Sequence, residues 1–262
     1  MSFLDDVSVL ILTYNEAPNI ARTLAALSAF PEIVVLDSFS TDETRMSVEC
    51  ATNARLVQRR FDTHAGQWNH GLVACGLSTP WVLALDADHL VPAQLVAEIA
   101  RLAPPPAVAG YRIAVRYCVH GRPLSAALYP PVVALVRRDR AHYVQTGHTQ
   151  RAIVDGAIAD LVNRIDHDDR KPLSRWLQSQ QTYARLEAEH LLALPRAELR
   201  WSDRIRRMAW PAPILVFVYT LLAKRCLLDG WPGWLYVLQR TLAETLIALE
   251  IVDRRLGHRR QK

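Results

Sequence analysis

Two carboxylates stand two residues apart directly after an apolar segment, in the sequence Trp81-Val-Leu-Ala-Leu-Asp86-Ala-Asp88. The apolar run is typical of a strand that is buried on both faces. Because side chains alternate in direction along a strand, residues two apart point to the same side. Paired oxygen donors of this kind suit Mg²⁺ or Mn²⁺, which keep further positions for water and phosphate oxygens. A solvated turn gives the same triplet, so the pattern alone leaves both interpretations open.

Polar side chains also follow two earlier apolar runs. The first run ends at Thr13 and is followed by Tyr14 and Glu16, and the second is followed directly by Asp37. In a parallel sheet such strand ends meet at one edge, beside helix N-termini that favour phosphate. A carboxylate at this edge can accept hydrogen bonds from a nucleoside. Taken singly, these residues are equally well explained as loop and helix-cap residues.

Strand-like and helix-like patterns alternate through the first hundred residues, and this alternation indicates which elements must position the polar residues. We expect strands at residues 7–13, 33–36, 54–57 and 81–85, separated by helices. This order predicts an α/β fold with a mostly parallel sheet flanked by helices. Residues 108–154 read as strands and loops and predict an antiparallel annex, and residues 172–194 predict a long helix. The dinucleotide-binding GxGxxG and phosphate-binding GxxxxGK[ST] patterns are both missing from the sequence, which argues against NAD and P-loop chemistry.

The segments ILTYNEAPNI, VVLDSFSTDET and WVLALDADH, in this order and spacing, resemble the inverting glycosyltransferases of family two, which have the nucleotide-sugar-binding GT-A fold. The resemblance is close over about residues 5–100. It implies a divalent metal, Mg²⁺ or Mn²⁺, and a nucleotide-sugar donor, with a UDP-sugar as the expected one. The donor contacts that it implies are Thr13, Tyr14, Glu16 and Asp37 at the nucleoside, Asp86 and Asp88 at the metal and diphosphate, and Gln67 and Asn69 beneath the donor.

The second half of the chain resembles, more loosely, the branch of that family that extends lipopolysaccharide cores. The matching segments are IDHDDRKPLSRW at 165–176, YARLEAE at 183–189 and LDGW at 228–231. This resemblance implies a glycolipid or lipopolysaccharide-core glycan as the acceptor. A carboxylate or a histidine would take the proton from the acceptor hydroxyl. The predicted roles are His148, Asp168 and Asp169 as candidate bases, His167 as a further metal ligand and Arg170 as a diphosphate contact.

The identity of the base is left open by the sequence. Some relatives carry a His-Glu pair before an arginine, whereas this chain has Gln150 where that glutamate would fall, two residues after His148. Asp168 or Asp169 would equally well cap the helix that opens at Pro172. Two other functions remain as alternatives: a nucleotidyltransferase on the same fold, which would release pyrophosphate, and a non-catalytic scaffold at a membrane surface.

The end of the chain differs from the rest in charge and in apolar pattern. The 67 residues after Pro195 carry 13 basic and 6 acidic side chains, whereas the preceding 195 carry 18 and 20. A uniformly basic nucleic-acid binder would not show this division, so no nucleic-acid partner is expected. Residues 208–223 form an apolar run of 16, shorter than the stretch of about 20 that a transmembrane helix needs. Interfacial aromatics and arginines predict instead an element that lies on an anionic membrane surface. Two helices packed on the body, or a true span, are the alternatives.

These patterns predict two domains. Residues 1–195 form the glycosyltransferase-like domain, with a nucleotide-binding half at 1–103 and an acceptor half at 104–195, and residues 196–262 form a helical, basic, membrane-associated extension. The apolar run behind the acidic N-terminus is too short for a signal-peptide core. We therefore expect a cytoplasmic protein that is peripheral on the inner face of the cytoplasmic membrane.

Overall fold

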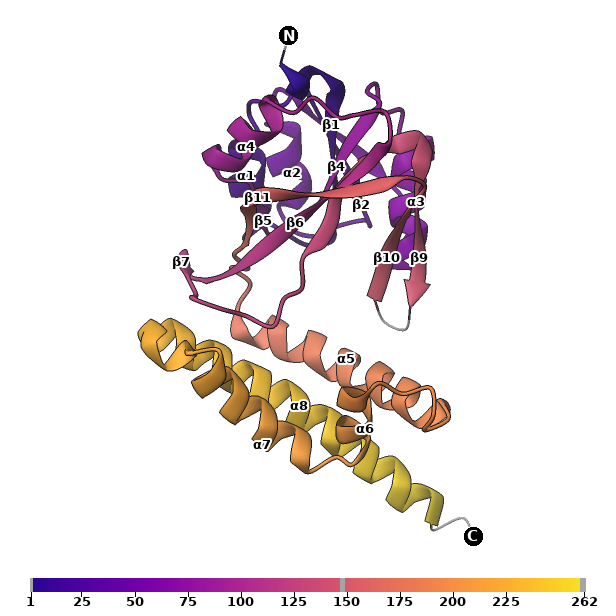
Figure 1. Cartoon of the computed structure of the whole chain (residues 1–262), viewed down its shortest axis with the longest axis vertical. Coiled ribbons are helices and arrows are strands. Elements are labelled where there is room, and N and C mark those ends of the chain that lie inside the picture. Colours follow the sequence, from indigo (N-terminus) through magenta and orange to yellow (C-terminus); the bar gives the residue numbers. More distant parts are fainter. Residues whose placement is uncertain (1, 147–148, 260–262) are drawn as a thin grey trace. The chain divides into compact units, whose positions relative to one another are not determined.

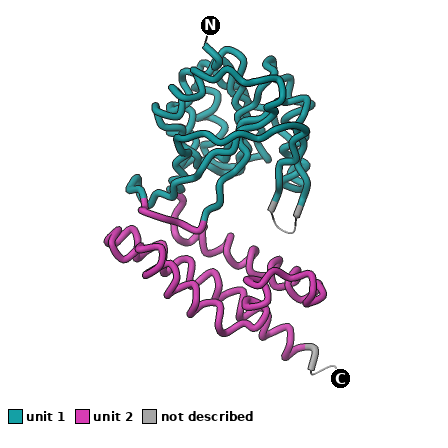
Figure 2. Tube along the Cα trace, viewed as in Figure 1, with its two compact units in different colours: residues 1–123, 129–170 teal, residues 124–128, 171–262 magenta. Residues whose placement is uncertain are grey.

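The computed structural model describes residues 2–146 and 149–259 and divides the chain into two compact units (Figure 2). Unit 1 comprises residues 1–123 and 129–170, and unit 2 comprises residues 124–128 and 171–262. The sequence pattern placed the domain boundary after Pro195 instead. The structural boundary falls earlier because the helix at Leu173–Ala193 packs against the C-terminal helix of unit 2.

Unit 1 is built on a nine-stranded sheet in which β3, β2, β1 and β4 are parallel neighbours (Figure 1). Beyond β4 the main path continues through β8, β6, β11 and β5, with β11 parallel to β6, and β7 pairs with β6 off this path. The predicted α/β class is therefore confirmed. The strands are β1 (Val7–Thr13), β2 (Glu32–Asp37), β3 (Ala54–Gln58), β4 (Trp81–Asp86), β5 (His89–Leu90), β6 (Val108–Val119), β7 (Arg122–Pro123), β8 (Val132–Arg137) and β11 (Ala157–His167).

Both faces of this sheet are covered, which explains the continuous apolar runs in its strands. Val9 and Ile11 of β1 belong to a buried cluster with α1 and α4, whereas Leu10 belongs to one with α3. On the α3 side lies a separate hairpin of β9 and β10 (Figure 1). The elements are α1 (Ile20–Ala26), α2 (Thr44–Glu49), α3 (His64–Ala74), α4 (Ala93–Ala100), β9 (Ala141–Thr146), β10 (Thr149–Val154) and the 3-10 helices Phe3–Asp6 and Arg138–Arg140.

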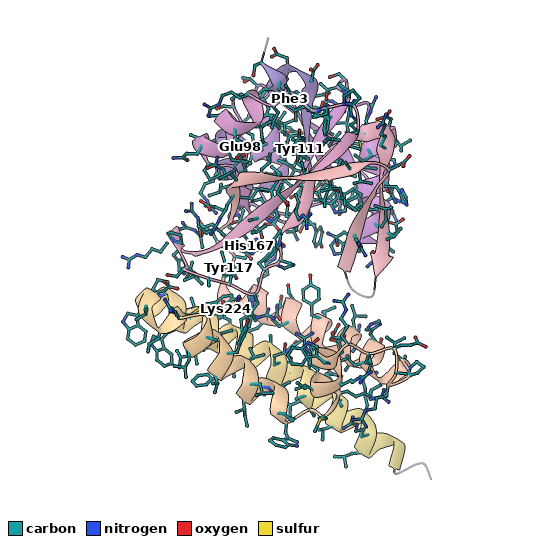
Figure 3. All side chains as sticks on the ribbon, viewed as in Figure 1. Phe3, Glu98, Tyr111, Tyr117, His167 and Lys224 are labelled. Atoms are coloured by element: carbon teal, nitrogen blue, oxygen red, sulfur yellow. The ribbon has the colours of Figure 1, made fainter. Side chains whose placement is uncertain are left out.

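The expected antiparallel annex is wrong as a separate element. Strand β8 pairs antiparallel with β4, so β6 and β8 extend the main sheet, and only the β9–β10 hairpin stands apart. No apolar pattern in the sequence predicts β11. Its register with β6 shifts between Asp160 and Arg164. At this irregularity Glu98 of α4 accepts hydrogen bonds from the backbone N–H groups of Val162 (2.7 Å) and Asn163 (2.8 Å). Glu98 thereby satisfies backbone donors near the register shift (Figure 3).

Unit 2 is helical. Its long helix α8 contacts both α5 and α7, and α7 runs alongside it (Figure 1). A buried ion cluster lies inside the unit, where Arg206 pairs with Glu244 (2.6 Å) and Glu187 (3.5 Å). The helices are α5 (Leu173–Ala193), α6 (Trp201–Arg207), α7 (Pro211–Val218), a π-helical turn (Tyr219–Ala223), a 3-10 turn (Cys226–Asp229) and α8 (Gly230–Arg259).

We find that no single helix in the described part of the chain is both long and apolar enough to cross a membrane. The segments Pro211–Ala223 and Cys226–Gly257 meet the length and hydropathy requirement only as a pair, and they are bent by 68° relative to each other.

Candidate functional site

Acidic side chains lie at the carboxyl ends of two strands that flank β1. In the sheet register Asp37 of β2 is opposite Thr13, and Asp86 of β4 is opposite Leu12. Since neighbouring strands lie about 4.8 Å apart, the backbones at Asp37 and Asp86 are about 10 Å apart along the same sheet edge. Asp88 follows Asp86 in the turn before β5. The register thus brings Asp37 and Asp86 to the same edge of the sheet, and the roles of these residues there stay predictions.

A cluster of possible metal ligands has formed at the end of β11. Antiparallel pairing of β11 with β5 places His167 opposite His89. The ligand atoms of Asp88, His89 and His167 all lie within 4.8 Å of one another, and Asp88 Oδ1 is 3.3 Å from His167 Nδ1. His167 also lies beside Tyr117, with ring centroids 4.9 Å apart (Figure 3). Asp88 and His167 were both predicted as ligands, whereas His89 was missed although it directly follows the acidic pair.

The tautomer of His89 sets its role in this cluster. Its Nδ1 accepts a hydrogen bond from the backbone N–H of Asp86 (3.2 Å), so a neutral ring carries its proton on Nε2. Burial lowers the pKa of His89, which keeps the ring neutral. The Nε2 atom lies 3.7 Å from Asp86 Oδ2, beyond hydrogen-bond distance, and has no hydrogen-bond partner among the described residues. His89 therefore fixes the backbone at Asp86 through Nδ1, and with its proton on Nε2 it is less suited to ligation than Asp88 and His167.

The pairing of Asp88 with His167 fits a cation site. Burial acts to lower the pKa of His167, but the negative charge and hydrogen bond of Asp88 outweigh it, and the pKa is raised. Asp88 and His167 would hold a divalent ion together only with the imidazole neutral, since ligation by histidine requires an unprotonated ring nitrogen. Carboxylate and imidazole together form a plausible donor set, with Asp86 at its more exposed side.

The loops that follow β1 and β2 are locked together by their own polar groups. The backbone N–H of Asn15 donates to Ser40 Oγ (2.7 Å), and the N–H of Thr41 donates to Asn15 Oδ1 (2.7 Å). Asn15 (φ 55°) and Phe39 (φ 64°) adopt left-handed backbone conformations, which non-glycine residues adopt at strained, often functional, positions. Both loops also expose an aromatic ring, Tyr14 (52% exposed) and Phe39 (47% exposed). Such faces can stack on a base. Phe39 was missed, although an aromatic residue in a serine-rich loop was its signal.

Asp37 is fully buried beneath these loops. Its carboxylate accepts hydrogen bonds from the Ser40 N–H (2.9 Å), the Ser40 hydroxyl and Gln58 Nε2 (3.1 Å). Thr13 Oγ1, close to it in register, is buried and makes no hydrogen bond to any residue that the structure describes. The geometry therefore shows Asp37 shaping the loop after β2, and its contact with a nucleoside stays a prediction.

The two polar residues predicted beneath the donor are engaged inside the protein. Gln67 Nε2 donates to Ser38 Oγ (2.8 Å), and its Oε1 accepts from Arg59 Nη1 (2.6 Å). Asn69 donates to the carbonyl of Tyr143 (2.8 Å) and accepts from its N–H (2.7 Å). The side-chain amide of Asn69 thus pairs with both backbone groups of Tyr143 in β9, and this helps to hold the hairpin on α3. These contacts support an indirect role for both residues.

Asp168 is held in an ion-pair network at the end of β11. The residue is 1% exposed, and its carboxylate accepts from Arg22 Nη1 (2.9 Å), Arg170 Nε (2.9 Å) and the Gly121 N–H (3.0 Å). Burial acts to raise the pKa of Asp168, but the hydrogen bonds from Arg170 and Gly121 outweigh burial and the pKa is lowered. The carboxylate therefore stays ionised and fully paired. This environment fits an anchor better than the predicted base. Likewise, Arg170 contacts Asp168 rather than standing ready for a diphosphate.

Asn19 links the loop after β1 to the loop after β11. Its Nδ2 donates to Glu16 Oε2 (2.9 Å) and to Asp169 Oδ1 (2.9 Å). Its Oδ1 accepts from the Arg170 N–H (2.8 Å) and Arg22 Nη2 (3.0 Å), and the residue is fully buried. The sequence signalled Asn19 only as part of the NEAPNI segment. Asp169 is brought beside the predicted donor loop, whereas His148, the other candidate base, lies outside the described residues.

Comparison with known proteins agrees with this geometry. The sequence profile of Glycosyl transferase family 2 matches residues 8–148. An uncharacterized glycosyltransferase of Rickettsia felis (strain ATCC VR-1525 / URRWXCal2) is 30% identical over 97 residues, which are 37% of this chain and 33% of that protein. The lipopolysaccharide core biosynthesis glycosyltransferase LpsC of Rhizobium meliloti (strain 1021) is 31% identical over 117 residues, 42% of each chain. This chain thus matches less than half the length of these curated relatives.

The crystal structure of S. aureus TarS in complex with UDP-GlcNAc is also similar, with a TM-score of 0.45 and 15% sequence identity over 96% of this chain and 92% of that chain. The family match is the decisive one, because it covers more than half of the chain and contains β1 to β4 with Asp37, Asp86 and Asp88. The resemblance seen in the sequence is confirmed: the chain belongs to glycosyl transferase family 2 and has a GT-A-like fold.

Proposed function

We propose that the protein moves a sugar from a nucleoside diphosphate sugar to a hydroxyl of a glycolipid or lipopolysaccharide-core glycan, with inversion at the sugar carbon. The observation that carries this proposal is the cluster of Asp88, His89 and His167, with Asp86 beside His89, in a family 2 chain. The relative LpsC, which is named for lipopolysaccharide core biosynthesis, supports the acceptor class. A UDP-sugar is the first donor to test.

Asp88 and His167 would hold a divalent cation, with Asp86 at its open side. When bound, Mg²⁺ or Mn²⁺ supplies positive charge that stabilises the departing diphosphate. The protein's own contribution is to fix these ligands. Burial and the hydrogen bond from the Asp86 N–H hold His89 in one tautomer, and the β5–β11 pairing sets the separation of Asp88 and His167. Groups that are held in place before the reaction stabilise the charge that develops on the diphosphate without having to reorganise.

Asp169 is our proposed base among the described residues. Its Oδ1 accepts a hydrogen bond from Asn19, and this bond holds the carboxylate beside Glu16 of the donor loop. Asp168 next to it has its oxygens paired with two arginines, so it is poorly suited to accept a proton. A positioned carboxylate that removes the acceptor proton contributes on the order of 10²–10⁴-fold to the rate. Inversion follows when the acceptor attacks from the face opposite the diphosphate.

The test is transfer by the parent and by Asp88→Asn, with Asp5→Asn as the matched control at an exposed carboxylate outside the site. Nucleoside diphosphate release would be measured with a panel of nucleotide sugars and Mn²⁺, and nucleotide binding by calorimetry. We expect Asp88→Asn to lower transfer by on the order of 10²-fold or more while Asp5→Asn does not. Transfer by Asp88→Asn at the parent rate, or in EDTA, would contradict the metal proposal.

Product analysis separates the alternatives. Release of pyrophosphate instead of a nucleoside diphosphate would identify a nucleotidyltransferase. Absence of any binding of nucleotide together with Mn²⁺ would identify a scaffold with a degenerate pocket.

A further inference from the structure

The turn between α7 and α8 exposes large apolar side chains. We call residues 224–231 the hairpin tip. Leu228 is 78% exposed and Trp231 is 85% exposed, and Leu227 beside them is 46% exposed. Tryptophan is usually well buried in folded proteins, so a side chain this exposed indicates a surface made for contact.

The exposed apolar surface continues from the hairpin tip along both helices. Ile214, Val218 and Leu222 are exposed at intervals of four residues, which places them on one face of the α7 segment. Leu238 and Leu242 are exposed on α8 with the same spacing. The core of unit 2 is formed by other α8 residues such as Val237 and Ile251, which are fully buried. Helix α8 therefore has a second apolar face in addition to the one that packs inside the unit.

The charges of this region are almost all positive. Residues 208–243 contain three basic side chains and one acidic side chain, Asp229. The Asp229 carboxylate is held by the Ser125 N–H (3.0 Å) and Ser125 Oγ (2.5 Å). Arg225 at the hairpin tip is exposed, and Lys224 Nζ lies 5.6 Å from the ring centroid of Tyr219. Apolar side chains are thus flanked by cations while the acidic group is bound within the unit.

We propose that the hairpin tip docks on the surface of an anionic lipid bilayer. Leu228 and Trp231 would enter the boundary between headgroups and acyl chains, while Lys224 and Arg225 meet lipid phosphates. An exposed tryptophan suits this boundary because its ring is apolar and its N–H is polar. The positive charge favours a lipid partner over a second copy of this chain, since two copies would bring like charges together. This inference rests on unit 2 alone and is separate from the proposed sugar transfer.

The test is sedimentation of the full chain with phosphatidylcholine vesicles, with and without phosphatidylglycerol. We expect the parent to bind the phosphatidylglycerol vesicles and the double variant Leu228→Glu/Trp231→Glu to bind them at least about tenfold more weakly. The control is Val73→Glu/Val162→Glu, which places two glutamates at exposed apolar positions of unit 1 and should bind as the parent does. Lys224→Glu/Arg225→Glu should lose the preference for phosphatidylglycerol. Circular dichroism and thermal melts establish that each variant is folded.

Two results would overturn the docking proposal. The first is failure of the folded parent to bind anionic vesicles, and the second is unchanged binding by Leu228→Glu/Trp231→Glu. Light scattering tests the alternative that a second copy of the chain covers this surface. A parent dimer that the double variant converts to monomer, with no vesicle binding by either, would assign the surface to a second copy and reject the lipid partner. Nucleotide binding by each variant reports separately on the proposed sugar transfer.

Discussion

Replacement of Asp168 and of its neighbour Asp169 by asparagine should separate folding from catalysis. Both aspartates follow the end of β11, and both were candidate bases in the sequence. In the structure Asp168 is 1% exposed and bonded to Arg22, Arg170 and Gly121, whereas Asp169 is half-buried beside Asn19. Asp168→Asn should therefore destabilise unit 1, and Asp169→Asn should lower turnover.

The expected size of the Asp168→Asn effect follows from its partners. Loss of one partner from a buried ion pair costs about 3–5 kcal/mol. The side chains of Arg22 and Arg170 are 34% and 33% exposed, so water can partly solvate them when the carboxylate is gone. We therefore expect the lower end, about 3 kcal/mol, and a fall in the melting temperature of unit 1 of about 6–12 °C. Asp169→Asn should cost about 1 kcal/mol or less but lower turnover by on the order of 10²–10⁴-fold.

Thermal denaturation followed by circular dichroism measures the first effect, and nucleoside diphosphate release measures the second. Asp160→Asn is the matched control, because Asp160 lies on β11, the strand just before Asp168, and its pair with Arg112 is exposed at the surface. An exposed pair of this kind contributes about 0.2–1 kcal/mol. An Asp168→Asn protein that melts with the parent yet has no activity would refute our reasoning and restore Asp168 as the base.

Two further substitutions test contacts outside this network. Burial acts to raise the pKa of Glu98, but hydrogen bonds from Val162 and Asn163 outweigh burial and the pKa is lowered. The contribution of Glu98 to the stability of unit 1 is therefore complete above the unfolded pKa of about 4.3 and is lost as the pH falls through the lowered pKa. Glu98→Gln should therefore lower the melting temperature at pH 7, and the gap to the parent should close in melts below pH 4; a constant gap would contradict this. Asn69→Ala should destabilise unit 1 by about 2 kcal/mol, because it leaves both backbone groups of Tyr143 without a partner. Calorimetry should show unchanged nucleotide affinity, and a large loss of affinity would mean that Asn69 touches the donor.

Strands β1, β2 and β4 could be predicted because each is almost entirely buried and so reads as a continuous apolar run. Strand β11 could not. Its polar sequence reflects a position near the sheet edge, where its far neighbour β5 is two residues long and Val162 is 85% exposed. An antiparallel annex was predicted over residues 108–154, but its division into main-sheet strands and a separate β9–β10 hairpin was not. The hairpin is held on α3 by residues far away in the sequence, through the hydrogen bonds of Asn69 and the stacking of Trp68 on Tyr143.

The site was predictable where residue type alone fixes the chemistry. Asp86 and Asp88 follow a buried strand, and this position identified them. The roles of Asp168 and Asp169 could not be separated in the same way, because their partners are not local. Arg22 lies 146 residues before Asp168, and Asn19 lies 150 residues before Asp169. Only the folded chain shows that Asp168 is bound by Arg22 and Arg170 and that Asp169 is bound by Asn19.

The amide of Asn19 has one permitted orientation. Rotation by 180° would turn its oxygen toward the carboxylates of Glu16 and Asp169 and its NH₂ toward the Arg22 guanidinium and the Arg170 N–H, so that all four contacts become repulsive. The Asn19 amide therefore ties the loop after β1 to the loop after β11. If Asp169 is the base, as we propose, a displacement of Glu16 by an arriving nucleotide would be transmitted through Asn19 to the proposed proton acceptor.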